Sequence, residues 1–121
     1  MGETIYQKLG AENLEKMVNK FYELVEQDDR INHLFKNDFN LIKQKQLMFL
    51  TQFLGGPQLY IQEYGHPRMR MRHMPHAITP AAAEAWLENM QQAIQSLPIE
   101  EEFKENIFNT FPKLAAHMIN Q

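Results

Sequence analysis

Apolar residues recur every three or four positions along most of the chain, which is the spacing of helices that bury one face. The clearest pattern covers residues 12–27 and places these apolar side chains on one face: Leu14, Met17, Val18, Phe21, Tyr22 and Val25. A second pattern begins at residue 39 or 40 and ends at Leu54, before Gly55-Gly56-Pro57. A third begins at Thr79-Pro80, an N-cap followed by proline, and continues to about residue 96. These patterns predict three long amphipathic helices.

Shorter helices are expected before and between the long ones. Thr4 and Gln7 have the spacing of a capping box, and Gly10 can end the short helix that they begin. A turn of helix over residues 31–35 is expected to follow a cap at position 28 or 29, where both residues are aspartate.

The end of the chain predicts a further helix that contains an interruption. Three consecutive glutamates at residues 100–102 suit the positive end of a helix. Pro112 lies inside the apolar pattern that follows, so we expect a kink near Phe108 or a short break. In no segment do apolar and polar residues alternate as they do in a half-buried β-strand. The fold class is therefore expected to be all-α, with about four substantial helices and several short ones.

The composition is that of one globular domain spanning residues 1–121, with 44% hydrophobic and 22% charged residues. The net charge of -3 disfavours a protein that coats nucleic acid. Cysteine is absent, which excludes disulfides, thiolate-held zinc and iron–sulfur clusters, so a metal would need His, carboxylate, Met or Tyr ligands. The sequence shows neither a basic and apolar leader nor a membrane span, so we expect a cytoplasmic protein with no membrane partner.

Residues 65–76 read Gly-His-Pro-Arg-Met-Arg-Met-Arg-His-Met-Pro-His, a concentration of histidine and arginine that no packing rule requires. Prolines at 67 and 75 leave room for only a short helix between them. The irregular stretch from Gly55 to Thr79 is also longer than the roughly two to eight residues that join helices in a bundle. We therefore expect this stretch to surround a bound group.

Large amphipathic side chains face the expected core at Tyr22, Gln46 and Trp86. A buried hydroxyl, amide and indole N–H each need a partner, and together they suggest a small polar site inside an apolar cavity. The simpler alternative is that each of the three groups forms a hydrogen bond with a different backbone carbonyl, without a shared site.

A haem would use all of these groups at once. Its iron takes an imidazole, its propionates take basic side chains, and its broad faces take apolar residues. His73 follows Arg72 directly and is flanked by Met69, Met71 and Met74. His73 can therefore bind the iron while Arg72 reaches a propionate.

The ordered series of motifs resembles the truncated haemoglobins, and within them group II. The resemblance spans nearly the whole chain and rests on Phe21-Tyr22, residues 49–57, Gly65-His66-Pro67, residues 70–73 and Ala85-Trp86-Leu87. It implies a truncated globin fold, a two-over-two helical sandwich. In that fold the helix pair at residues 12–54 packs against the pair at 80–120, with haem b (iron protoporphyrin IX) between them.

The resemblance also implies roles for individual residues. The proximal iron ligand falls on His73, and the distal tyrosine and tryptophan fall on Tyr22 and Trp86. Gln46 matches a second distal position, whereas the usual place of a distal histidine falls on Ile42, which cannot form a hydrogen bond. The other expected pocket residues are Phe35, which wedges the haem, Lys45, Tyr60 and Arg72, which match propionate contacts, and Phe49, Leu50, Phe53, Met69, Met74, Ile78 and Met90.

A second imidazole, that of His76, lies three residues after the expected ligand, where relatives often carry an apolar aromatic residue. Pro75 separates the two and should turn His76 away from the iron. We expect His66, His33 and His117 at the rim or the surface, with His66 the nearest to the haem edge.

The function that follows is reversible binding of O2, and of other diatomic ligands, at a His-ligated iron. Slow release would suit scavenging, sensing, or redox chemistry with nitric oxide or peroxide, which needs an unidentified reductant, more than oxygen transport. Whether the protein is an enzyme is left open, because no second cofactor domain or reductase site is evident.

Two alternatives use the same stretch differently. A haem-free metal-binding or hydrolytic helical module would use His66, His73 and His76, with Glu63 as a further ligand. A nucleic-acid or protein-binding module would use the arginines at 68, 70 and 72, although few other basic residues lie nearby to extend that patch.

Overall fold

The computed structural model describes residues 3–35, 39–65 and 79–118 of the chain. Its regular elements in these ranges are all helical: α1 (Ile5–Leu9), α2 (Ala11–Glu26), the 3-10 helix η1 (Asn32–Phe35), α3 (Phe39–Phe53), α4 (Leu59–Tyr64), α6 (Pro80–Gln95), α7 (Glu101–Phe108) and α8 (Phe111–Met118). The all-α prediction is confirmed. No helix within the described ranges combines the length and the apolar character needed to cross a membrane.

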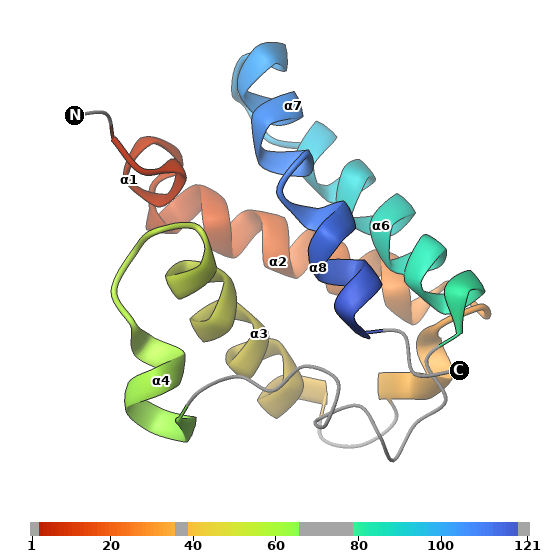
Figure 1. Ribbon diagram of the computed structural model, residues 1–121. Coiled ribbons are helices and arrows are strands. Elements are labelled where there is room, and N and C mark those ends of the chain that lie inside the picture. Colours follow the sequence, from red (N-terminus) through yellow and green to blue (C-terminus); the bar gives the residue numbers. More distant parts are fainter. Residues whose placement is uncertain (1–2, 36–38, 66–78, 119–121) are drawn as a thin grey trace.

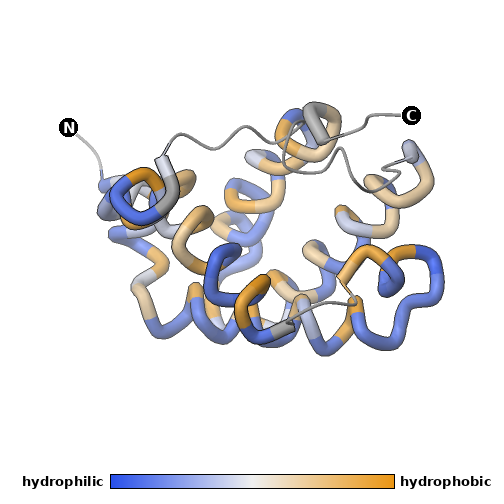
Figure 2. The backbone as a smooth tube through the Cα atoms, turned by 90° about the horizontal axis from the view of Figure 1, so that it is seen from below, coloured by the Kyte–Doolittle hydropathy of each residue, from blue (hydrophilic) through white to orange (hydrophobic). Residues whose placement is uncertain are grey.

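The helices form two packed pairs. Helix α2 packs against α3 on one side and α6 on the other, and α6 also packs against α7 and α8, which run back along it (Figure 1). Figure 2 shows apolar and polar positions alternating along the helices, as expected when each helix buries one face. The result is the two-over-two globin arrangement that the sequence predicts.

The apolar face of α2 lies at the centre of this arrangement. All of its predicted inward residues are buried, at 2% exposure or less: Leu14, Met17, Val18, Phe21, Tyr22 and Val25. Burying a side chain of this size contributes about 1.5–3 kcal/mol. The hydrophobic effect therefore fixes the rotation of α2 about its own axis and decides which residues it presents to its neighbours.

The predicted helix ends are confirmed by their hydrogen bonds. At the start of α1 the backbone N–H of Gln7 donates to Thr4 Oγ1 at 3.1 Å, and that of Thr4 donates to Gln7 Oε1 at 2.9 Å. At the start of α6 the N–H of Ala82 donates to Thr79 Oγ1 at 3.1 Å. The interruption expected near the end of the chain separates α7 from α8, with Pro112 in the first turn of α8, where proline costs no hydrogen bond.

Gly56 lies where α1 meets the connection between α3 and α4. The backbone N–H of Tyr6 donates to the carbonyl of Leu54 at 2.8 Å, which brings the Tyr6 ring over the glycine. A Cβ on Gly56 would lie 2.6 Å from the Tyr6 ring and 2.9 Å from the carbonyl oxygen of Thr51. Helix α1 can therefore seal this end of α3 only because position 56 has no side chain.

Replacing Gly56 with alanine is expected to lower the free energy of unfolding by about 1–3 kcal/mol, because the ring and the backbone must move apart. Urea unfolding followed by circular dichroism measures the change. Gly10→Ala is the comparison, since a Cβ there meets nothing within 4 Å and strains only the positive φ of 87°. Unchanged stability in Gly56→Ala would show that α1 does not dock as described.

Candidate functional site

Two polar aromatic side chains lie at the interface of α2 and α6, and both contact the same phenylalanine ring. Tyr22 on α2 is 2% exposed and Trp86 on α6 is 6% exposed. The ring of Phe21 contacts both in edge-to-face geometry, with centroid distances of 5.0 Å to Tyr22 and 5.2 Å to Trp86. The sequence-based expectation that both residues face the core is confirmed.

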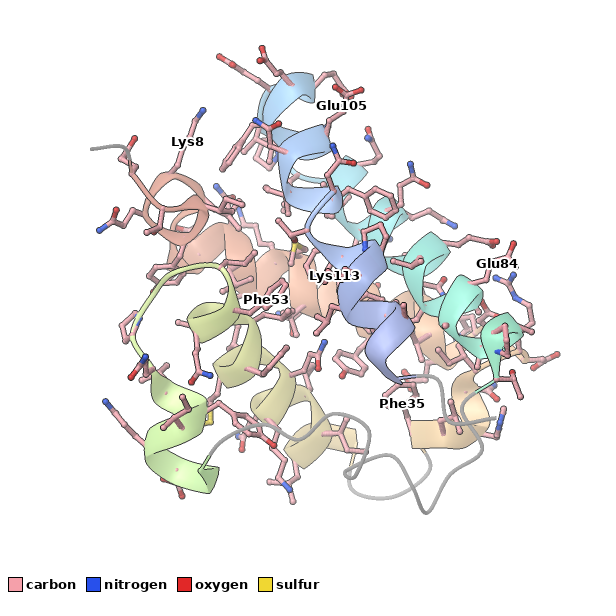
Figure 3. The ribbon with its side chains drawn as sticks, viewed as in Figure 1. Lys8, Phe35, Phe53, Glu84, Glu105 and Lys113 are labelled. Atoms are coloured by element: carbon pink, nitrogen blue, oxygen red, sulfur yellow. The ribbon has the colours of Figure 1, made fainter. Side chains whose placement is uncertain are left out.

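Further aromatic rings extend this pair into a continuous wall, in which each ring contacts the next. At one end Phe35 lies 5.6 Å from Tyr22. At the other end the contacts run from Trp86 through Phe111, Phe53 and Phe49 to Tyr60, with centroid distances of 5.5, 5.8, 5.7 and 5.8 Å. Figure 3 shows Phe53 between α3 and α8, and Phe35 near the C-terminal end of α8. The wall is large, apolar and built from distant parts of the chain.

Helix α3 contributes most of the other predicted pocket residues. Phe49 and Leu50 are buried, as are Tyr60 on α4 and Met90 on α6. Half-buried residues are Phe35, Ile42, Lys45 and Gln46. The ring of Phe53 is 37% exposed although it stacks on two other rings. An apolar ring left accessible beside an aromatic wall provides surface that a flat apolar group could cover.

The predicted iron-binding stretch lies outside the described residues. Met69, Arg72, His73, Met74 and Ile78 all fall there, as do the alternative ligands His66 and His76 and the other arginines of the stretch. Within the described ranges no group of three or more His, Asp or Glu side chains is placed to hold a metal ion. The assignment of His73 as iron ligand therefore stays a prediction.

The protonation state of Tyr22 follows from its burial. Removal from water disfavours the charged phenolate and raises the pKa of Tyr22 well above its ordinary value. The phenol is therefore protonated at every physiological pH and can act as a hydrogen-bond donor. The Trp86 indole is a donor at any pH, so Tyr22 and Trp86 both carry a group that can donate a hydrogen bond.

Sequence reasoning did not assign Phe21 and Phe111 to the site, although it expected both to be buried. Phe21 links Tyr22 to Trp86, and Phe111 links Trp86 to Phe53. The local signal for Phe21 is its place directly before Tyr22 in an apolar pattern. Phe111 has no such signal, because its neighbours in the wall come from α3 and α6.

A buried polar contact beside the wall was also missed. Asn89 on α6 is 4% exposed, and its amide nitrogen donates to Asp28 Oδ2 at 2.9 Å. Hydrogen bonds from Arg30, and then from Asn89, hold the pKa of Asp28 well below its ordinary range. Because that pKa is lowered on folding, the carboxylate stabilises the fold at neutral pH, and its contribution is lost as the pH falls through the acid range.

Comparison with known proteins assigns the chain and its fold to one class. Residues 4–120 match the model of the family described as bacterial-like globin. The group 2 truncated hemoglobin YjbI of Bacillus subtilis (strain 168) is 41% identical over 116 residues, which cover 96% of this chain and 88% of that protein. A group 2 truncated hemoglobin of Lotus japonicus is 35% identical, covering 95% of this chain and 71% of that protein.

Comparison with solved structures also finds truncated hemoglobins. The crystal structure of the group II truncated hemoglobin from Bacillus anthracis matches with a TM-score of 0.93 and 38% identity, over 100% of this chain and 94% of that one. The truncated oxygen-avid haemoglobin from Bacillus subtilis matches with a TM-score of 0.90 and 40% identity, over 98% and 100%. The two-over-two fold and these matches define a globin. The chain belongs to the bacterial-like globin family and, within it, to the group II truncated haemoglobins.

Membership of this family implies a haem cofactor and haem-based ligand binding. The described part of the site fits such a group. The wall offers apolar rings to a flat macrocycle, Lys45 on α3 is half-buried and Tyr60 on α4 belongs to the wall, and both polar aromatic residues contact Phe21.

Proposed function

We propose that this protein binds haem b and, through it, binds O2 reversibly in the cytoplasm. The observation that carries the proposal is the meeting of Tyr22 and Trp86, two buried hydrogen-bond donors, on either side of Phe21. A small diatomic ligand is an acceptor to which a phenol O–H and an indole N–H can both donate a hydrogen bond.

The chain would hold the cofactor from several sides. His73 is the proposed iron ligand, and Arg72, Lys45 and Tyr60 are the proposed partners of the propionates. Helix α4, which carries Tyr60, starts at a position fixed from α3, because the backbone N–H of Ile61 donates to the side chain of Gln52 at 2.9 Å. That bond serves as a remote cap for a helix whose own N-cap residue forms none. The apolar faces would contact the wall, together with Ile42 and Met90, and Met69, Met74 and Ile78 from the stretch outside the described residues.

Haem, when bound, supplies the iron at which a diatomic ligand is held. Tyr22 and Trp86 would donate hydrogen bonds to a bound diatomic ligand, which favours a ligand that carries partial negative charge. Gln46, half-buried on α3, could add a third donor. The side chain of Ile42 can donate nothing, so retention of the ligand rests on a phenol and an indole in place of an imidazole. Each net hydrogen bond contributes on the order of 1 kcal/mol, and more to a polarised acceptor.

Slow release of O2 follows from two or three donors, because each 1.4 kcal/mol slows dissociation about tenfold. The Bacillus subtilis relative is described as oxygen-avid, which supports the same property here. A protein that releases O2 slowly suits scavenging, sensing, or redox chemistry with nitric oxide or peroxide, supported by a reductant, better than oxygen transport.

The decisive experiment is to titrate the purified chain with haem. We expect one haem per chain, a strong absorption band at about 400 nm, and, after reduction, a further spectral change on adding O2 that reverses when O2 is removed. Metal analysis of the protein as purified is the control. A colourless chain that does not bind haem and contains bound zinc would overturn the proposal in favour of a His-based metal site.

A further inference from the structure

Asn89 is a buried polar side chain whose contacts do not belong to the wall itself. Its amide nitrogen donates to Asp28 Oδ2 at 2.9 Å and to the carbonyl oxygen of Ala85 at 2.9 Å. A primary amide has two N–H donors, so both are used and the orientation of the group is fixed. Asn89 therefore connects α6 to the segment that follows α2.

The bond to Ala85 places this connection directly at Trp86. The Ala85 carbonyl belongs to the peptide unit that supplies the backbone nitrogen of Trp86. Residues three apart on a helix lie on the same face, and both Asn89 and Trp86 are buried on the face of α6 that packs against α2. The amide thus holds the turn of helix that carries the indole.

Asp28 is the fixed point at the other end of the connection. Its side chain accepts from Arg30 Nε at 3.0 Å and from Arg30 Nη2 at 2.8 Å, and from the backbone N–H of Arg30 at 3.0 Å. Its own N–H donates to Val25 at the end of α2, and its carbonyl accepts from Ile31 and Asn32 at the start of η1. Asp28 therefore fixes the end of the helix that carries the distal tyrosine against the element that carries Phe35.

We propose that Asn89 is a positioning residue: by tying the Trp86 turn of α6 to Asp28, it sets how far the indole N–H reaches toward a ligand beside Tyr22. This inference rests on the proposed function and deepens it. An apolar side chain at position 89 could fill the α2–α6 interface as well, but it would lose the directional hydrogen bond of 2.9 Å that joins α6 to Asp28. The bond to Ala85 lies within α6 and orients the amide for that contact. The ion pair between Arg30 and Glu88 also joins this segment to α6, but both of its side chains are nearly half exposed.

The test is the haem-loaded Asn89→Leu protein, which keeps a side chain of similar volume but has no donor. We expect O2 dissociation to be about tenfold faster, a part of the effect of removing the indole N–H itself. Two spectroscopic measurements report the position of the Trp86 indole independently of the O2 dissociation rate. Trp86 is the single tryptophan of the chain, so ultraviolet resonance Raman bands of indole report on it alone. The C–O stretch of the carbon monoxide complex reports the donors near the ligand. Both should shift.

Two matched variants separate positioning from general stability. Asn13 on α2 donates to the carbonyl of Leu9 on α1 at 3.0 Å, so Asn13→Leu loses a side-chain bond over the same sequence spacing that involves no ring of the wall, and its dissociation rate and indole bands should stay as in the parent. Asp28→Asn keeps an acceptor for Asn89, and it should restore most of the parental C–O stretch that Asp28→Leu loses.

Unchanged indole bands, C–O stretch and O2 dissociation in Asn89→Leu would overturn the inference. If that variant does not fold, Asp28→Leu breaks the same connection from the other side, and parental spectra there would overturn it equally. The proposed function fails differently: the parent chain would then not bind haem, and no O2 dissociation could be measured in any variant.

Discussion

Trp86→Phe is expected to speed O2 dissociation by about 10- to 100-fold, because a hydrogen bond to a polarised acceptor is worth roughly 1.5–3 kcal/mol. Phenylalanine keeps a ring against Phe21 and Phe111, which contact Trp86 at 5.2 and 5.5 Å, so the wall should survive while the donor is lost. Stopped-flow mixing of the oxygenated protein with an oxygen scavenger measures the rate. Tyr22→Phe should also speed O2 dissociation, and the double variant should release O2 faster than either single variant.

Phe53→Leu is the control for this prediction, since it reduces a wall residue that is 37% exposed without removing a donor. Its effect on dissociation should be small compared with that of Trp86→Phe. If Trp86→Phe retained O2 as long as the parent, the indole would not be a distal donor, and retention would have to rest on Tyr22 and Gln46.

His73→Ala is expected to abolish proximal coordination, with loss of the iron–imidazole stretch in resonance Raman spectra of the reduced protein and a fall in haem affinity of at least tenfold. An axial ligand contributes binding free energy that van der Waals contact with the wall cannot replace. Free imidazole added to the variant should restore the spectrum, because it can enter the space left by the side chain.

His76→Ala is the matched control, because it removes the second imidazole of the same stretch and should leave the iron–imidazole stretch in place. The opposite pattern, with coordination intact in His73→Ala and lost in His76→Ala, would make His76 the ligand. It would also mean that Pro75 directs the chain toward the iron instead of away from it.

Local signals in the sequence account for most of the helices. The pattern predicted for residues 12–27 became α2 (Ala11–Glu26), and Thr79-Pro80 starts α6 as expected, because capping and periodicity act within a few residues. Leu87 is apolar and follows Trp86 directly, but it is only half-buried, since the width of a buried face depends on the neighbouring helices.

Parts of the site could not be predicted for the same reason. The hydrogen bond from Asn89 to Asp28 joins residues 61 apart in the chain, and no local pattern pairs them. The contacts of Phe111 with Trp86 and Phe53 likewise depend on how α8 crosses α3 and α6. Tyr22 and Trp86 were accessible to sequence reasoning because a polar tip at an inward helical position is itself unusual. The assignments of His73 and Arg72 rest on the sequence alone.

The chemistry of the two proposed donors, a phenol and an indole, has a consequence for acidifying conditions. A distal histidine changes its charge between about pH 5 and 8, so the strength of its hydrogen bond to a ligand changes with the acidity of the cell. The phenol of Tyr22, with its pKa raised by burial, and the indole of Trp86 keep their protons throughout that range. A globin that retains O2 with this pair would hold it equally well in neutral and in acid-stressed cells.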